Sequence, residues 1–406
     1  IDIPNLGGAR GSSRAQAGPE ADGSARRMTE QSGTQARECH GCTRHALTGD
    51  THMWRSKARG VLFTMAVLAI ASLLPSVQGT EGPPELVFLN WSEYMDPGLL
   101  AEFERVHGVR VREAYFESDD DRDRLVQQTR AKGYDVALVN GNMLERYVRR
   151  GWVSKLDPEQ IPHLKHIDSR WSNAFEGAVG YGVPYFWGVL GIAYRRDLID
   201  GPLRRWMDVF RPAEALCGRI VMMNQSRDLI GMALVALGFS ANSTDPGELN
   251  AAETLLMAQK PCVKDYYYLA LSERSALVTG EVAAAMMYSG DARMVRDHHE
   301  AIDYTIPEEG TNLWVDYLVV MANSPRKELA HRFIDFLNEP KRAARLAEYL
   351  FYASPNLAAE PFLSDKHRHD PVIHPPREVL QRSETYNRLP PRAIKQRNLI
   401  FHRVTE

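Results

Sequence analysis

The chain has 406 residues, of which 44% are hydrophobic and 25% are charged. This length predicts two lobes with appendages rather than one simple core, and the composition excludes wholesale disorder. The net charge of −3 divides into 9 basic and 6 acidic residues over 1–79, and 40 basic and 46 acidic residues over 80–406. The mildly acidic body argues against nucleic acid as a partner, because phosphate binding needs a basic face.

The N-terminal segment differs in composition from the rest of the chain. Residues 1–52 are rich in Gly, Ser, Ala and Arg, and we interpret them as a disordered, non-native upstream extension; a genuine disordered extension is the alternative. Three basic residues then precede an apolar run at 61–74, which is shorter than the ~20 residues that span a bilayer. This pattern predicts a signal peptide at 53–79 that begins at Met53 and is cleaved near Gly79. We therefore expect export to a Gram-negative periplasm.

The four cysteines divide between the two parts of the chain. Cys39 and Cys42 have CxxC spacing, but no second pair completes a zinc site, so we expect no metal or redox function there. Cys217 and Cys262 belong to the exported part, where two cysteines can pair in an oxidising compartment. The sequence leaves open whether their Cα atoms come close enough for a disulfide.

From residue 85 the apolar patterns of strands and helices alternate. The first unit predicts strands at 86–89, 109–111 and 134–139, and helices that start at Pro97, run over about 121–132 and centre on 143–148. Gly108, Gly133 and Gly151 follow these helices, as is typical of helix ends. Because strands and helices alternate, we expect a parallel sheet with right-handed crossovers.

After residues 188–194 the pattern restarts as a second α/β unit. Its predicted strands are 220–223, 282–288 and 314–321, and its predicted helices are 227–238, 247–259, 273–279, 327–338 and 340–350. Beyond Asn356 the chain is rich in Pro and charge, which predicts a wrapping tail with one or two short helices. The fold class is therefore predicted to be α/β.

Aromatic and acidic residues gather where predicted strands end. Asn90–Tyr94 follow the first strand, and similar clusters recur at 185–187, 288–291 and 314–316. Open α/β sheets place their ligand crevice at the carboxyl ends of strands. An aromatic face beside a carboxylate suits an organic cation.

On these residues the chain resembles the periplasmic spermidine/putrescine-binding proteins of polyamine ABC importers, a family that includes sensory adaptors. The resemblance runs from about 86 to 359 and rests on four motifs: Asn90–Tyr94, Val183–Gly188, Trp314–Asp316 and Tyr352–Ala358. It implies a two-lobe periplasmic binding protein of type II-like fold that traps ligand in a cleft by hinge closure. The implied lobes are 84–190 plus 314–358, and 195–310 plus 361–406.

The resemblance also implies a set of ligand-binding residues. Five match the family directly: Trp91, Tyr94, Trp314, Asp316 and Tyr352. Five others stand at family positions but differ in residue type: Asn140, Asn142, Gln225, Asp228 and Tyr288. Gln225 replaces an acid and so removes one charge, which leaves the length of the preferred polyamine open. A glutamine of the family near the C-terminus corresponds to Glu384 or Tyr386.

Other polar clusters have simpler interpretations. The run Asp119–Asp123 is expected to be a solvated helix entry, and Glu93 and Glu117 to be surface acids. Neither 298–300 nor 367–369 has the spacing of a metal site on one helix face. The chain has no Walker loop, nucleophile elbow or zinc-protease motif, so we expect no enzyme, cofactor or metal.

Two functions follow from the resemblance. The first is capture of a polyamine and its delivery to an inner-membrane ABC importer. The alternative is a sensing adaptor that reports polyamines to a membrane-bound cyclic-di-GMP signalling protein. In both cases we expect a monomer that does not bind nucleic acid.

Overall fold

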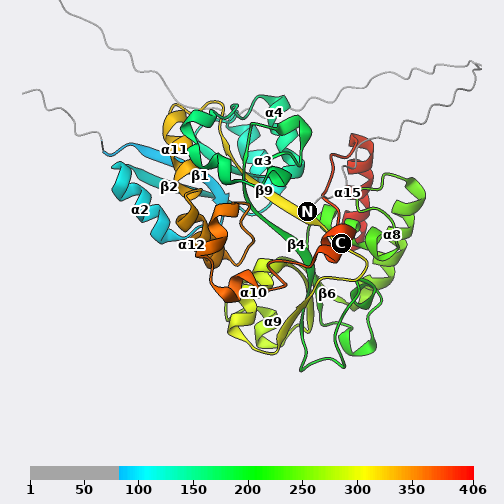
Figure 1. The fold of residues 1–406 in the computed structure, drawn as a ribbon. Helices are drawn as coiled ribbons and strands as arrows, with labels where there is room; N and C mark the ends of the chain where they lie inside the picture. Colours follow the sequence, from blue (N-terminus) through cyan, green and yellow to red (C-terminus); the bar gives the residue numbers. More distant parts are fainter. Residues whose placement is uncertain (1–81) are drawn as a thin grey trace, which may run out of the picture. The chain divides into compact units, whose positions relative to one another are not determined.

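The computed structural model describes residues 82–406 (Figure 1). The predicted signal peptide, the upstream segment 1–52 and the pair Cys39 and Cys42 lie outside these residues. In the part of the chain that the structure describes, no helix is long and apolar enough to cross a membrane.

Strands and helices alternate as the sequence predicts, but the strands Val263–Tyr266 and Ile302–Thr305 and the helix Ser289–His298 were not predicted. The tail was predicted to hold one or two short helices, and it instead ends in a helix of 15 residues, Pro391–Thr405. The strands are β1 (Glu85–Trp91), β2 (Arg110–Phe116), β3 (Val136–Asn140), β4 (Val183–Arg195), β5 (Ile220–Met222), β6 (Val263–Tyr266), β7 (Ala284–Tyr288), β8 (Ile302–Thr305) and β9 (Leu313–Val320). The longer helices are α2 (Pro97–His107), α3 (Asp119–Gln128), α4 (Gly141–Arg150), α7 (Ser226–Ala236), α8 (Pro246–Gln259), α10 (Ser289–His298), α11 (Lys327–Leu337), α12 (Pro340–Leu350) and α15 (Pro391–Thr405). The shorter helices are α5 (Ser169–Ser172), α6 (Met207–Phe210), α9 (Ala276–Thr279), α13 (Asp365–Arg368) and α14 (Arg377–Arg382). The described residues also form six short 3₁₀ helices: η1 (Pro158–Gln160), η2 (Pro162–His166), η3 (Glu176–Ala178), η4 (Glu214–Leu216), η5 (Lys260–Cys262) and η6 (Leu357–Phe362).

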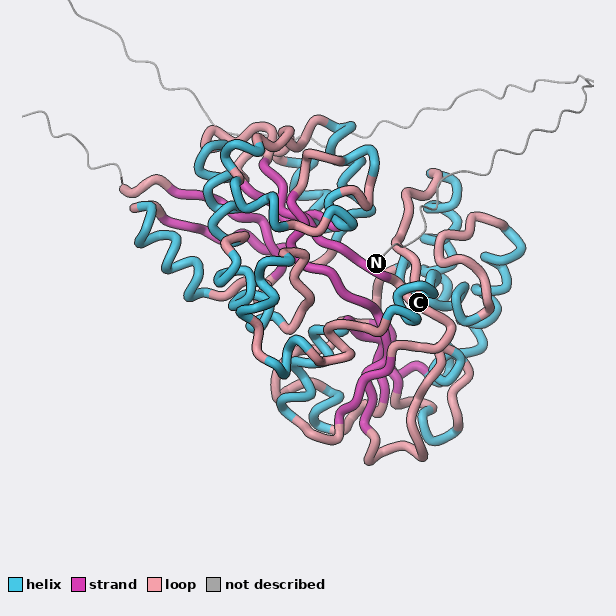
Figure 2. Tube along the Cα trace, in the orientation of Figure 1, coloured by secondary structure: helices cyan, strands magenta, loops and turns pink. Residues whose placement is uncertain are grey.

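The strands form one continuous mixed sheet in the order β2-β1-β3-β9-β4-β7-β5-β6, with β8 paired to β4 (Figure 2). Strand β1 is parallel to β2 and β3, as predicted for the first unit. Strand β9 runs antiparallel to both β3 and β4, so the whole sheet is mixed rather than parallel. Because β3 and β9 are antiparallel neighbours, the last residue of β3, Asn140, pairs with Asp316 of β9.

Strand β4 connects the two ends of this sheet. Its residues 183–189 pair with β9, whereas residues 190–195 pair with β7 and β8. All thirteen of its residues are buried. Figure 1 shows β4 and β9 crossing the middle of the molecule, between the helices α3 and α4 on one side and α9 and α10 on the other.

The buried apolar residues divide at this crossing. One cluster draws on residues 86–189 and 313–373, and the other two draw on 190–302 and 386–404. We call the parts built around these clusters the first lobe and the second lobe. The exact lobe boundaries given above remain predictions.

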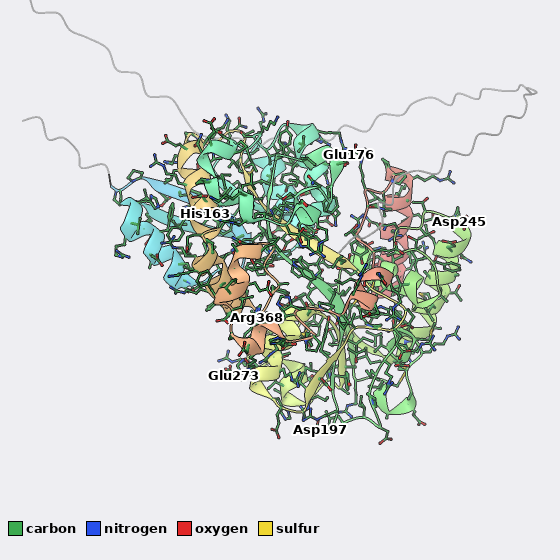
Figure 3. The ribbon with its side chains drawn as sticks, in the orientation of Figure 1. His163, Glu176, Asp197, Asp245, Glu273 and Arg368 are labelled. Carbon is green, nitrogen blue, oxygen red and sulfur yellow. A yellow bond between two sulfur atoms is a disulfide. The ribbon has the colours of Figure 1, made fainter. Side chains whose placement is uncertain are left out.

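Local side-chain chemistry accounts for several helix ends. Asp96 accepts a hydrogen bond from Gly98 N at 2.7 Å at the start of α2, and Gly108 ends that helix at φ +66°. Asp245, labelled in Figure 3, caps α8 in the same way by accepting from Gly247 N at 2.8 Å. Because these caps are encoded in the sequence, the predicted starts of α2 and α8 lie within about one residue of the observed ones.

The helix predicted over about 121–132 starts close to the observed α3 but extends too far at its end, because α3 runs from Asp119 to Gln128. Arg130 and Ala131 leave the helix with positive φ values of 54° and 56°. Ala131 is fully buried, so burial of its methyl group compensates for this unfavourable backbone conformation. The helix predicted over 273–279 is also shorter than expected and covers only Ala276–Thr279.

The interpretation of Asp119–Asp123 as a solvated helix entry is confirmed for its first part and wrong for its last two residues. The segment opens α3 with Asp120 exposed, but Arg122 and Asp123 are buried. Arg122 is completely buried, and its Nη1 lies 2.6 Å from Asp119 Oδ1. Its Nε donates to Tyr147 Oη at 3.1 Å, and Asp123 lies 3.5 Å from Nη2. The guanidinium of Arg122 packs against the ring of Phe116, and Asp119 and Asp123 neutralise it.

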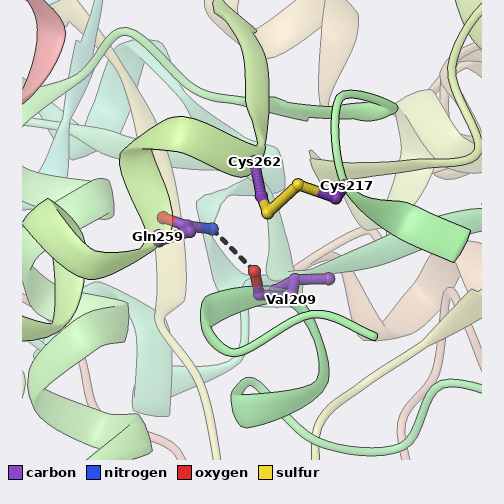
Figure 4. The surroundings of a disulfide bond; sticks show 4 residues. All are labelled: Val209, Cys217, Gln259 and Cys262. Carbon is purple, nitrogen blue, oxygen red and sulfur yellow. Dashed lines mark hydrogen bonds between the residues drawn. A yellow bond between two sulfur atoms is a disulfide. The ribbon is translucent and has the colours of Figure 1, made fainter. Parts of the chain in front are cut away.

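Cys217 and Cys262 form a disulfide (Figure 4). The bond joins the loop before β5 to the turn after α8. Beside it, Gln259 donates its side-chain Nε2 to the carbonyl oxygen of Val209 at 2.7 Å. The sequence left open whether these two cysteines pair, and the structure shows that they do, within the second lobe.

Candidate ligand site at the strand crossing

Strand β9 carries the first acid of the site. Asp316 pairs in register with Asn140 at the end of β3, and Asn140 Nδ2 donates to Asp316 Oδ1 at 3.2 Å. The Asp316 side chain is 6% exposed, and this burial raises the pKa of its carboxyl to about 7. The hydroxyl of Tyr94 lies near this carboxylate, but its geometry falls short of a hydrogen bond and it has no partner within residues 82–406. The Asp316 carboxylate and the Tyr94 hydroxyl could therefore both form hydrogen bonds with a ligand.

Aromatic rings form a continuous wall beside Asp316. The ring centroids of Tyr94 and Tyr352 lie 5.8 Å apart, those of Tyr352 and Trp314 4.9 Å, and those of Trp314 and Tyr288 5.7 Å. Each pair meets edge to face, with the edge of one ring against the face of its neighbour. We call Tyr94, Tyr352, Trp314 and Tyr288 the aromatic wall.

Two glycines allow this wall to pack closely. A Cβ at Gly188 of β4 would lie 2.7 Å from Trp314 Cζ2, and a Cβ at Gly290 of α10 would lie 2.5 Å from Tyr352 Cε1. Any larger residue at these positions displaces a ring. Because these two positions are glycines, Trp314 packs closely on β4 and Tyr352 packs closely on α10.

A second buried acid lies at the Tyr288 end of the wall. Asp228, in the first turn of α7, is 3% exposed and accepts a hydrogen bond from Tyr288 Oη at 3.0 Å. Burial raises its pKa to about 6. Tyr386 also lies close to this carboxylate, although its hydroxyl does not reach good hydrogen-bond geometry. The wall is thus bounded by an acid at each end.

The sequence prediction missed a third acid, Asp291 of α10. Its Oδ1 accepts a hydrogen bond from Tyr352 Oη at 2.7 Å, and its Oδ2 accepts from Tyr268. Burial raises its pKa to about 6. The sequence does carry a signal, because 288–291 forms one of its aromatic and acidic clusters, but the resemblance implies a ligand role only for Tyr288 in that cluster.

For three of the predicted ligand-binding residues, the contacts described here lie outside the aromatic wall and its three acids. Trp91 packs its ring on Phe116 at 4.4 Å between centroids, at the end of β1. Asn142 sits in the first turn of α4, where its backbone N–H donates to Asn140 Oδ1 at 3.3 Å. Gln225 precedes α7 without capping it through its side chain. Their roles in ligand binding stay predictions.

The two C-terminal candidates separate clearly. Glu384 accepts hydrogen bonds from Ser240 Oγ at 2.6 Å and from Asn242 Nδ2 at 3.2 Å, so it fastens the tail to the second lobe. Tyr386 is buried beside Asp228, with Arg227 over its ring at 4.9 Å. Of the two, Tyr386 is the one placed next to the site.

The chemistry of this arrangement favours a cation. Three buried carboxylates adjoin the aromatic wall. Burial raises the pKa of each, and at Asp228 and Asp316 it outweighs the opposite effect of Arg227 and Arg122. Within residues 82–406, no group of three His, Cys, Asp or Glu side chains is arranged to hold a metal ion. An organic ammonium would neutralise the acids and lie on the aromatic faces.

The sequence is similar to known binding proteins over most of the described region. A family model described as bacterial extracellular solute-binding protein matches residues 98–373. The spermidine/putrescine-binding periplasmic protein of Escherichia coli (strain K12) is 30% identical over 304 residues, which cover 74% of this chain and 86% of that protein. The norspermidine sensor of Vibrio cholerae serotype O1 is 31% identical over 323 residues, which cover 79% of this chain and 89% of that protein.

The fold is also similar to solved structures. The spermidine/putrescine ABC transporter substrate-binding protein PotD of Streptococcus pneumoniae superimposes with a TM-score of 0.70 at 27% identity. The match covers 79% of this chain and 98% of that one. The α/β fold class of a two-lobe periplasmic binding protein, predicted from the sequence, is confirmed.

Proposed function

Because the chain belongs to the bacterial extracellular solute-binding protein family, as its motifs predicted, we propose that it captures a polyamine between its two lobes and delivers it to an ABC importer. The family is a class of binding proteins rather than enzymes. The proposed setting is the periplasm, reached by the predicted signal peptide at 53–79, and the proposed working form is a monomer.

One observation carries this proposal: acids from both lobes converge on a single aromatic wall. Asp316 belongs to the first lobe, whereas Asp228 and Asp291 belong to the second. A linear polyamine carries ammonium groups separated by short alkyl segments. Its charges would pair with the acids, and its methylene groups would lie along Trp314 and Tyr352.

Ligand binding then favours closure for a physical reason. Without a cation, the closed lobes bring three carboxylates into a dry region, which is unfavourable because each must lose its hydration or take up a proton. A polyamine supplies the missing positive charge, so it stabilises the closed arrangement relative to the open one. A permease that recognises both lobes together would select the loaded form.

The test is isothermal titration of the purified, ligand-free protein with putrescine, spermidine, norspermidine and spermine. Saturable binding of at least one of them, lost in Asp316→Asn, supports the proposal. The exposed acid Glu159 supplies the control, because Glu159→Gln removes the same charge away from the site. Absence of binding to all four polyamines would exclude a polyamine-binding function.

A second candidate is a polyamine-sensing adaptor for an inner-membrane cyclic-di-GMP signalling protein. Two features favour it: a relative at 31% identity is a norspermidine sensor, and Gln225 stands where the resemblance implies an acid. Reconstitution separates the candidates. A transporter role requires polyamine uptake with the cognate permease, whereas a sensing role requires a polyamine-dependent change in the activity of a membrane cyclase or phosphodiesterase.

A further inference from the structure

A cavity lies beside Tyr94. It has a volume of about 490 Å³ and is lined from both lobes. The first lobe contributes Glu113 and Tyr115 of β2, and the second lobe contributes Leu271 and residues of α10. Tyr94 belongs to both places, because it lines this cavity while its ring packs on Tyr352 of the aromatic wall. We call this cavity the outer pocket.

The outer pocket repeats the chemistry of the inner site. Its walls include the rings of Tyr115, Tyr349 and Phe351. Its acids are Glu93, Glu113 and Asp297, and among its lining residues, all within 82–406, there is no Lys or Arg. The lining also includes His298, and Asp297 has a basic partner, so Glu93 and Glu113 supply the net negative charge. Aromatic faces beside these two carboxylates favour an organic cation over an anion or a neutral molecule.

Two of the acids remain available to a ligand. Asp297 is already paired with Arg293. Glu93 and Glu113, in contrast, form no salt bridge with any residue of 82–406. Glu93 also adopts a left-handed backbone conformation at φ +59°, which is uncommon for a residue with a side chain and is typical of functional sites.

A buried amide holds Glu113 in place. Asn90 is completely buried, and its Nδ2 donates to Glu113 Oε1 at 3.3 Å and to the carbonyl oxygen of Tyr94 at 3.3 Å. Its Oδ1 has no hydrogen-bond donor among the described residues. The hydroxyl of Tyr115 donates to Glu113 Oε2 at 3.1 Å. The carboxylate is therefore oriented by a buried side chain beneath it and an aromatic ring beside it.

We propose that the outer pocket binds an additional ammonium group of a long polyamine whose other amines occupy the inner site. The inference rests on the proposed polyamine-binding function and defines its substrate class as one that includes linear tetraamines. Tyr94 lies at the junction, where its ring would contact the alkyl segment that joins the two sites. Because the outer pocket is lined from both lobes, its occupant would also favour closure.

The test compares spermine, a tetraamine, with putrescine, a diamine, by isothermal titration of the purified protein. We expect Glu113→Gln to weaken spermine binding about fivefold to tenfold, as for a partly exposed charge-assisted contact, and to change putrescine binding less than about twofold. Tyr115→Ala should act in the same direction. Glu159→Gln removes the same charge from an exposed position outside the pocket and should leave both affinities unchanged. Both test residues line a solvent-open cavity, and unchanged unfolding temperatures would confirm that the variants fold.

The possible results are distinct. Selective loss of spermine affinity supports the outer pocket. Equal loss for spermine and putrescine, or no loss for either in both variants, overturns it while leaving the inner site intact. A wild-type protein that binds spermidine but gains nothing from the fourth amine of spermine also overturns it. If the wild-type protein binds no polyamine, the proposed function fails first, and this inference fails with it.

Discussion

Gly290 lies directly beneath the ring of Tyr352, so that a Cβ at position 290 would stand 2.5 Å from two ring carbons. Gly290→Ala therefore forces Tyr352 away from Trp314 and from Asp291, to which its hydroxyl donates. We expect a loss of about 1–3 kcal/mol in the free energy of unfolding, typical of overpacking, and a weaker affinity for polyamine. Thermal unfolding and isothermal titration measure the two effects.

The control for this substitution is Gly82→Ala, because nothing lies within 4 Å of a Cβ at that position. It should change neither stability nor affinity. If Gly290→Ala also left the affinity unchanged, the position of the Tyr352 ring would not matter for binding, and the aromatic wall would be structural only.

Trp314 and Trp91 were both predicted to contact ligand, yet the structure places them differently. Trp314 is the centre of the aromatic wall, between Tyr352 and Tyr288, whereas Trp91 packs on Phe116. We expect Trp314→Ala to weaken polyamine binding by roughly tenfold to a hundredfold, because a cation–π face and its apolar contact are lost.

Trp91→Ala is the matched comparison, since it removes the same side chain at the end of another strand. We expect it to weaken binding less than about threefold while lowering stability through the lost contact with Phe116. Intrinsic fluorescence during titration adds a second readout, because quenching by ligand should vanish in Trp314→Phe. Equal losses of affinity at both positions would extend the site to Trp91.

The local order of elements could be predicted from the sequence, because it depends on short-range patterns. Strand β1, helix α2 and helix α8 follow from apolar periodicity and from caps such as Asp96 and Asp245. The mixed sheet could not be predicted in the same way. It depends on β4, whose two halves pair with different partners, and strand partners far apart in sequence leave no local signal.

Site residues that belong to a sequence motif could be predicted, whereas those that are distinguished only by their burial and tertiary contacts were missed. Trp314 and Asp316 stand two residues apart on one strand, so a single motif identifies both. Asp291 resembles any acid in the first turn of a helix, and only the tertiary contact with Tyr352 distinguishes it. The burial of Arg122 has no local signal either, because a charged run in the sequence does not show which of its members is buried.

The Cys217–Cys262 disulfide closes a loop with a sequence separation of 45 residues. Restricting a loop of this length in the unfolded chain should stabilise the second lobe by about 2–4 kcal/mol. The double substitution Cys217→Ser with Cys262→Ser should therefore lower the unfolding temperature, measured by calorimetry. Dithiothreitol should lower the unfolding temperature of the wild-type protein and leave that of the double variant unchanged. At temperatures below the unfolding transition, the polyamine affinity of the double variant should equal that of the wild-type protein, because neither cysteine belongs to the aromatic wall or its acids. A large loss of affinity would instead show that this loop contributes to the site.

Asp316 gives the site a predicted pH dependence with a defined sign. Burial raises its pKa from 3.8 to about 7 in the ligand-free protein, so folding favours its neutral form. Its contribution to stability is therefore fully present below the unfolded-state pKa and is lost as the pH rises through about 7. Ligand binding has the opposite dependence, because an ammonium pairs with the ionised carboxylate. Binding should release a proton just below pH 7, and affinity should fall by up to about tenfold between pH 7 and 6. Below pH 6 it should fall more steeply, because Asp228 and Asp291 then also take up protons.

Isothermal titration at several pH values, in buffers with different ionisation enthalpies, measures both the affinity and the protons released. In Asp316→Asn we expect weaker binding and no slope between pH 6 and 8. A residual slope should persist below pH 6, because burial also raises the pKa of Asp228 and Asp291 to about 6. Thermal unfolding of the ligand-free protein supplies the opposing readout, since Asp316 should make the wild-type protein more stable at pH 6 than at pH 8, relative to the variant. A wild-type affinity that stays constant between pH 6 and 8 would mean that the Asp316 carboxylate is not the partner of the ligand ammonium.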